Sequence, residues 1–186
     1  MKITFSLIAV LAASSLVAGT KFATVDMLKL VRNHPNSSSN KALLTTTESD
    51  YKKKLDAIKA DVEKIQEEGK KLSEQLRNPM LAANAKQKLE KELIDVQNRF
   101  LAGQQKLRSE AMRSQQDLQD LESRLLKTTS IDLKKRIAKF AEDKDYSLIL
   151  DVAAAIYSKA EFDVTDEILK EMGVDPAKTE KNDESK

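Results

Sequence analysis

The clearest pattern along the chain is an apolar position every 3.5 residues on average, beginning near residue 51. The residues between these positions are almost all charged or polar. The positions follow one another at steps of four and three: Tyr51, Leu55, Ile58, Val62, Ile65, Gly69, Leu72 and Leu76. This spacing makes a narrow apolar seam on one side of a helix, and another helix must bury it. The pattern therefore predicts a long coiled-coil helix from about Lys41 to Arg77.

A second helix continues the pattern after Asn78-Pro79 and ends near Lys144. Its seam residues are Leu89, Leu93, Val96, Phe100, Gly103 and Leu107, followed by Ala111, Ser114, Leu118, Leu121 and Leu125. The two consecutive steps of four that meet at Leu107 are a stutter, which locally unwinds a supercoil. Two heptad helices joined by a two-residue break predict an antiparallel hairpin over residues 41–144, with the proline in the first turn of the second helix.

Gly69 and Gly103 stand at seam positions where an apolar side chain is expected. In one interpretation each glycine leaves a gap, costs about 1 kcal/mol relative to alanine in a helix, and lets the hairpin bend. In the other interpretation, the missing side chain permits close contact between the helices. The sequence leaves both interpretations open.

Short β-forming segments flank the hairpin. Lys21–Asp26 alternates like a strand, and Tyr146–Asp151 and Ala153–Tyr157 are predicted to be two further strands around a turn near Val152. Strands this short cannot stand alone, so they need partners within or between chains. The fold class that follows is mostly α with a small β part, in which residues 20–40 and 145–173 form a body at the base of the hairpin.

The segments that join these elements carry recognisable helix signals. Residues 27–31 suggest a turn or two of helix, which His34-Pro35 interrupts because proline pushes its predecessor out of helical geometry. Ser39 or Asn40 would cap the long helix that follows. Thr165 is the predicted N-cap of a last short helix, and Gly173 its C-terminal cap.

The first 19 residues are predicted to be a secretory signal peptide. Lys2 is followed by an apolar run of about 16 residues and by small residues, with cleavage after Ala18 or Gly19. An uncleaved membrane anchor is the competing interpretation, although a spanning helix needs about 20 strongly apolar residues. At the other end, residues 174–186 are charged and lack apolar periodicity, which predicts a disordered tail.

Composition excludes several function classes. One third of the residues are charged, aromatic residues make up 4%, cysteine is absent and the net charge is +2, which gives no indication of nucleic-acid binding. The single histidine, His34, is predicted to be a surface or turn residue, and no second histidine could complete a metal site with it. Without a phosphate-binding loop or a nucleophile motif, we predict no catalytic, cofactor-binding or metal site.

Three stretches of the chain resemble the Skp (OmpH-like) family of periplasmic chaperones. They are KFATVDMLKLV after the signal, the coil, and DYSLILDVAAAIYSKAEFDVTDEILKEM near the end. The last is the most specific, since Asp151, Tyr157 and Asp163-Val164-Thr165 match an aspartate that closes a strand, a following tyrosine and an Asp-x-Thr before the final helix. The resemblance spans residues 21–172.

The resemblance implies a homotrimer whose short strands pool into one β-body, with three helical hairpins around a cavity. It also implies ATP-independent binding of unfolded outer-membrane proteins in the periplasm, without a cofactor. The residues expected to form the body core and trimer interface are Phe22, Val25, Leu148, Leu150, Ile156 and Tyr157. Met80 and Leu81 at the hairpin tip are a possible client contact, although packing across the hairpin end is an equal alternative.

Two matters stay open at this point. Known members of that family are strongly basic, whereas this chain is near neutral with nine acidic and four basic residues in 161–186, so contact with anionic membranes is uncertain. The rival function is that of a structural coiled-coil spacer or tether of the cell envelope. The terminal strands favour the chaperone, because a passive rod would not need a β-body at one end.

Overall fold

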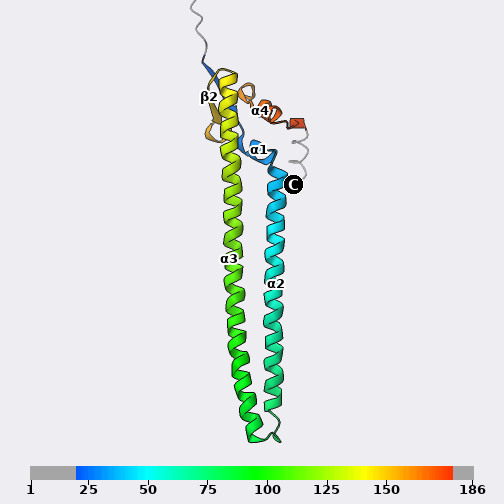
Figure 1. Cartoon of the computed structure of the whole chain (residues 1–186). Helices are drawn as coiled ribbons and strands as arrows, with labels where there is room; N and C mark the ends of the chain where they lie inside the picture. Colours follow the sequence, from blue (N-terminus) through cyan, green and yellow to red (C-terminus); the bar gives the residue numbers. More distant parts are fainter. Residues whose placement is uncertain (1–19, 178–186) are drawn as a thin grey trace, which may run out of the picture.

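The structure, a computed structural model, describes residues 20–177 and has the form of a long helical hairpin on a small body (Figure 1). The predicted signal peptide (1–19) and tail residues 178–186 lie outside the described part. In chain order the elements are β1 (Lys21–Val25), α1 (Met27–Arg32), α2 (Ser37–Leu76), α3 (Ala83–Asp143), β2 (Tyr146–Asp151), 3₁₀ turns at Val152–Ala154 and Ala160–Phe162, and α4 (Thr165–Glu171). The fold is mostly helical, as predicted.

Helices α2 and α3 run antiparallel over the whole length of α2 (Figure 1). At 1.5 Å per residue, 40 residues make α2 about 60 Å long and 61 residues make α3 about 90 Å long. The C-terminal part of α3 continues past the start of α2 and becomes the central helix of the body. We call α2 and the part of α3 beside it the arm.

Both ends of α2 differ from the prediction. The helix begins at Ser37 rather than Lys41, so neither Ser39 nor Asn40 is its cap; the N-cap is Asn36, whose side chain makes no capping bond. At the other end, six residues separate the helices instead of two, and Pro79 is not in the first turn of α3. The side chain of Asn78 accepts a hydrogen bond from Met80 N at 3.0 Å, which stabilises a turn before α3 can start.

At the two seam glycines a side chain of the facing helix lies close to the glycine backbone. A Cβ built on Gly103 would stand 2.8 Å from Val62 Cγ2, and one built on Gly69 would stand 3.3 Å from Val96 Cγ1. Each glycine position is therefore filled by a valine of the facing helix. The gap interpretation was wrong, and the close-contact interpretation is confirmed.

The sheet contains two strands, β1 and β2, which pair in parallel. The predicted second C-terminal strand, Ala153–Tyr157, is not formed. Asp151 ends β2, and its carboxylate accepts a hydrogen bond from Ala153 N at 3.1 Å, which starts a 3₁₀ turn instead. A run of β-forming residues was misleading here because a local side-chain cap stopped the strand.

The hydrophobic core lies in the body, where α1, α4, the sheet and the end of α3 meet. Its most buried members are at most 1% exposed and come from α1, α3 and α4: Leu30, Leu133, Phe140, Ile168 and Leu169. Phe140 also stacks on Tyr146, with ring centroids 5.9 Å apart. The core thus joins residues of β1 and α1 to residues of α3 and α4 that lie more than 100 positions away in the sequence.

The C-terminal end of α4 agrees with the prediction, but its N-terminal end does not. Gly173 has φ +77°, the left-handed conformation that suits a glycine after a helix. Thr165 is the first residue of α4 rather than its N-cap. Val174, placed in the predicted tail, packs against the core instead, because its N–H bonds to Leu169 O at 2.9 Å. No helix within residues 20–177 is both long and apolar enough to cross a membrane.

Candidate functional site

The outer face of the sheet is the first candidate surface. The register pairs Phe22 with Leu148 and Thr24 with Leu150, while the alternate residues of both strands face α3 and the core. The outer apolar side chains are about half-exposed. With residues 155–162 they line an open pocket of about 360 Å³. Parallel sheets are normally covered on both faces. Here residues 155–162 cover this face only in part: Thr24 is buried, with its hydroxyl 3.1 Å from that of Ser158, while the apolar side chains beside it stay half-exposed.

The six residues predicted for the body core divide into two groups. Val25 is buried, with 2% exposure, and belongs to the core of the single chain. The other five lie at its surface: Phe22, Leu148 and Leu150 are half-exposed, Tyr157 is 80% exposed and Ile156 is fully exposed. Within one chain these five do not form a core. Their role as an interface between chains stays a prediction.

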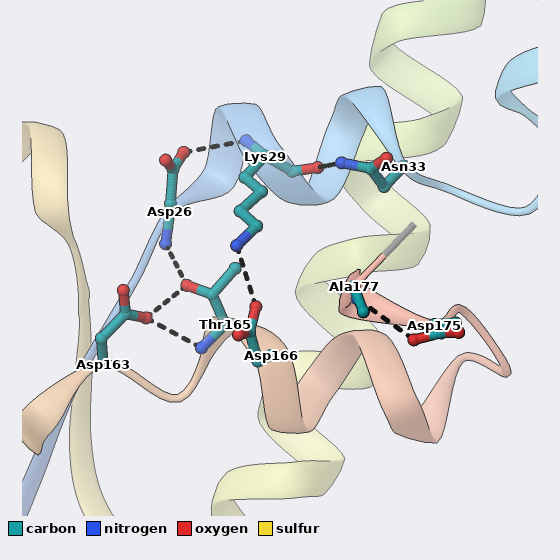
Figure 2. Close-up of polar contacts among 8 residues, drawn as sticks. All are labelled: Asp26, Lys29, Asn33, Asp163, Thr165, Asp166, Asp175 and Ala177. Carbon is teal, nitrogen blue, oxygen red and sulfur yellow. Dashed lines mark hydrogen bonds and ion pairs between the residues drawn. The ribbon is translucent and has the colours of Figure 1, made fainter. Parts of the chain in front are cut away.

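A group of hydrogen bonds and one ion pair join the start of α1 to the start of α4 (Figure 2). The buried Thr165 hydroxyl accepts a hydrogen bond from Asp26 N at 2.8 Å and donates one to the carboxylate of Asp163. The same carboxylate accepts from Thr165 N at 2.9 Å, and Lys29 Nζ pairs with Asp166 at 2.9 Å. The Asp-x-Thr sequence thus ties α4 to the chain directly after β1.

A second group of polar contacts lies where the arm meets the body. His34 lies in the connection between α1 and α2, which fits the turn alternative of the prediction, but its side chain is buried and not at the surface. Its Nε2 is 2.9 Å from Oδ2 of Asp132 in α3. Its Nδ1 accepts a hydrogen bond from Asn36 N at 3.1 Å, so the ring carries its proton on Nε2. Hydrogen bonds from Arg136 and then His34 hold the pKa of Asp132 below its ordinary value.

Few of the seam residues predicted for the arm are fully buried. Val62 and Val96, the partners of the two glycines, are buried. Ser114 is also buried, and Ala111 is exposed. Other seam side chains are of intermediate exposure: Tyr51, Leu55, Ile58, Ile65, Leu72, Leu76, Leu89, Leu93, Phe100 and Leu107. A two-helix seam thus leaves much of its apolar surface within reach of solvent.

One edge of the arm is closed by polar contacts between the helices. We define the closed edge as the residues of α3 that directly precede a seam residue. Arg99 of this edge bonds to Glu68 at 3.2 Å, Asp117 accepts a hydrogen bond from Tyr51 Oη at 3.0 Å, and Glu110 pairs with Lys54. The hydrogen bond to the Asp117 carboxylate raises the pKa of the Tyr51 phenol.

The tip residues predicted as a possible client contact lie outside the helices. Met80 is 89% exposed and Leu81 is half-buried in the turn before α3. Neither residue is in the hydrophobic core. The exposure of Met80 argues against packing across the hairpin end, and client contact at the tip stays a prediction.

The described residues contain no group of three or more His, Asp or Glu side chains that could hold a metal ion. Sequence reasoning missed the His34–Asp132 joint, because the two residues are 98 positions apart. It also missed the difference between the edges of the arm. That difference could have been found by comparing the residue before each seam position with the residue after it.

The geometry combines a body that has one half-exposed apolar sheet face with an arm that has a shallow apolar seam. The profile of the protein family described as outer membrane protein (OmpH-like) matches residues 21–172, which spans every helix and strand of the structure. No curated protein matches the chain.

Proposed function

We propose that this chain, which belongs to the OmpH-like outer membrane protein family of chaperones, is an ATP-independent holdase. In this role it binds unfolded outer-membrane proteins and keeps them from aggregating on their way to the outer membrane. The observation that carries the proposal is the arm, about 60 Å long, with an apolar seam that one facing helix covers only in part.

The sheet supports assembly with further copies of the chain, and the number three is what the resemblance to the family implies. A parallel pair of strands with Phe22, Leu148 and Leu150 half-exposed is incomplete in water, and a second chain that covers this face would remove the exposed apolar area. The exposed Ile156 and Tyr157 lie next to β2 and extend the same surface. We therefore assign these five residues to the interface of a homotrimer.

The division of the chain follows from this assignment. Residues 20–40 and 145–173 are the trimerisation body, residues 41–144 are the arm that holds the client, and residues 1–19 direct the chain to the periplasm and are then removed. A holdase needs no fuel when many weak contacts act together on one client. Arms that stand apart from the body can surround a client without a specific binding pocket.

Two measurements on the mature protein test the proposal. Light scattering should give the mass of a trimer, and an unfolded outer-membrane barrel protein diluted from urea should stay soluble at near-stoichiometric ratios. A monomer or dimer that leaves aggregation unchanged contradicts the proposal. That result would favour the rival, a coiled-coil spacer or tether of the cell envelope.

A shortened arm separates assembly from client binding. Val62 lies opposite Gly103, so replacing residues 63–102 by a short Gly-Ser linker cuts both helices at one level. The shortened protein should remain a trimer, because the body is untouched, and should lose client protection. Undiminished protection would show that the arm is not the binding element.

A further inference from the structure

The second edge of the arm has a composition unlike the first. We define the open edge as the ten exposed residues of α3 that directly follow a seam residue from Leu93 onward: Ile94, Gln97, Leu101, Gln104, Arg108, Met112, Gln115, Gln119, Glu122 and Leu126. Two of these ten are charged, whereas nine of the ten closed-edge residues before the same seam positions are charged. The two edges therefore present different surfaces along the same stretch of helix.

The apolar members of the open edge form one stripe. Ile94, Leu101, Met112 and Leu126 are 52–65% exposed. Their steps of 7, 11 and 14 residues keep them within about 40° of one another around a helix of 3.6 residues per turn. The stripe is about 48 Å long at 1.5 Å per residue, which equals the length of roughly 14 residues of extended chain.

No side-chain hydrogen bond or ion pair between α2 and α3 crosses the open edge in the described part of the chain, in contrast to the closed edge. A groove of about 610 Å³ lies there instead, with Ile65, Val96 and Phe100 among its apolar lining residues and Leu101 and Gln97 among those of the open edge. At a similar level the closed edge has a groove of about 330 Å³ lined mostly by charged residues. The open-edge groove has five apolar lining residues beside the charged Lys70, Glu74 and Arg77, whereas the closed-edge groove at this level has two apolar lining residues.

The side chains around the stripe identify what would bind there. Glutamine amides both donate and accept hydrogen bonds, which suits the N–H and C=O groups of an extended backbone of any sequence. On α2, the residues after the seam positions include four basic and two acidic side chains, so this side of the groove is positive: Lys52, Asp56, Lys59, Glu63, Lys70 and Arg77. The matching ligand is an extended polypeptide with apolar side chains and neutral or acidic neighbours.

We propose that the open edge is the surface of the arm that holds the client. The occupant is an unfolded, extended segment with alternating apolar side chains, as in the strands of an outer-membrane barrel. This inference rests on the proposed function and specifies where on the arm it acts. Leucine, isoleucine and methionine bind by area rather than by shape, which suits a chaperone with many clients.

A photocrosslinking pair tests the placement directly. Leu101 and Ala102 are adjacent, both are exposed, and they belong to the open and closed edges respectively. With a photoreactive amino acid at one of these positions in the full mature protein, a urea-unfolded outer-membrane barrel protein should crosslink strongly from position 101 and weakly from position 102. Equal yields, or chain-to-chain adducts from position 101 without client, would overturn the inference; the latter would make this edge an interface between copies.

A pair of triple variants tests the energetics. Ile94→Gln, Leu101→Gln and Met112→Gln together should weaken client binding about tenfold, because three apolar contacts are lost. The control combines Ile94→Leu, Leu101→Met and Met112→Leu, which keeps the stripe apolar and should leave the affinity unchanged. Both sets use good helix formers, and circular dichroism checks that the helix content is equal.

The unmodified protein distinguishes the failure of this inference from that of the proposed function. If it fails to protect the client, the proposed function fails and this inference falls with it. If it protects and the glutamine variant protects equally well, only the open edge is wrong. If it protects and both triple variants lose binding equally, shape rather than apolar character matters and the inference is overturned.

Discussion

The body and the arm share helix α3 yet bury its side chains to very different degrees. In the body, Leu133 and Phe140 are at most 1% exposed and contact residues from both ends of the chain. In the arm most seam residues remain partly exposed. Ser114 is a buried seam residue near the stutter, and its hydroxyl has no hydrogen-bond partner in the described part of the chain.

One helix thus serves two mechanical roles. Stability in the body is concentrated in a few side chains that pack on all sides, so losing any of them is costly. Stability in the arm is spread over many half-buried contacts, and local opening there requires little free energy. A client can therefore compete for the surface of the arm while the body stays folded.

The largest expected effect is the loss of stability when Phe140 in the body is truncated. Phe140→Ala removes a fully buried ring that stacks on Tyr146 and should lower the free energy of unfolding by about 3–5 kcal/mol. Denaturant unfolding at fixed protein concentration measures the loss, since assembly makes stability depend on concentration. The control Met112→Ala, on the same helix but 65% exposed, should change the stability by less than about 0.5 kcal/mol. Equal effects would mean that the arm is as tightly packed as the body.

Replacing a seam glycine by alanine tests how tightly the two helices of the arm pack. Alanine favours a helix by about 1 kcal/mol over glycine, but in Gly103→Ala the new methyl group meets Val62, whose β-branched side chain is held in one rotamer. Overpacking should then cost about 1–3 kcal/mol and reverse the gain. Gly69→Ala, with its looser 3.3 Å contact, should be neutral or stabilising.

A double variant identifies the cause of the Gly103 effect. If the methyl group clashes with Val62, adding Val62→Ala should make Gly103→Ala less costly than it is alone, as a double-mutant cycle in thermal unfolding would show. Hydrogen exchange should place the change in the arm and leave the amides of β1 and α4 as protected as before. Additive effects of the two substitutions would refute the close contact.

The architecture of the arm could be predicted from the sequence because its contacts repeat. Each seam residue has the same kind of neighbour, so spacing alone predicted the antiparallel hairpin. The body has no such repetition. Its strands pair residues more than 120 positions apart, and nothing local in Tyr146–Asp151 indicates Lys21–Val25 as the partner.

The prediction errors have specific physical causes. Residues 153–157 have a strand-like composition, but the carboxylate of Asp151 caps a 3₁₀ turn there. His34 precedes a proline in a connection between helices, which normally means exposure; Asp132, far along the chain, supplies the partner that allows burial. Such tertiary partners cannot be read from periodicity.

The smallest expected effect concerns the contact between Asp132 and His34, which joins the body to the arm. The pKa of Asp132 is lower in the folded protein than its ordinary value of 3.8, because Arg136 and His34 donate hydrogen bonds to its carboxylate. A carboxylate with a depressed pKa stabilises the fold above its unfolded pKa, and that contribution is lost as the pH falls through the folded value. Asp132→Asn should therefore be less stable than the wild type at pH 6, and the difference should shrink below about pH 4.

The size of this effect is limited by exposure. The Asp132 side chain is 41% exposed, so solvent screens its ion pair with Arg136, and the difference at pH 6 should stay below about 1 kcal/mol. Asp120→Asn, an exposed change on the same helix, should give no comparable pH-dependent difference. Because His34 joins Asp132 to the residues before α2, hydrogen exchange in Asp132→Asn should rise first at the start of α2. A rise confined to the distal arm would mean that the joint does not link the two regions.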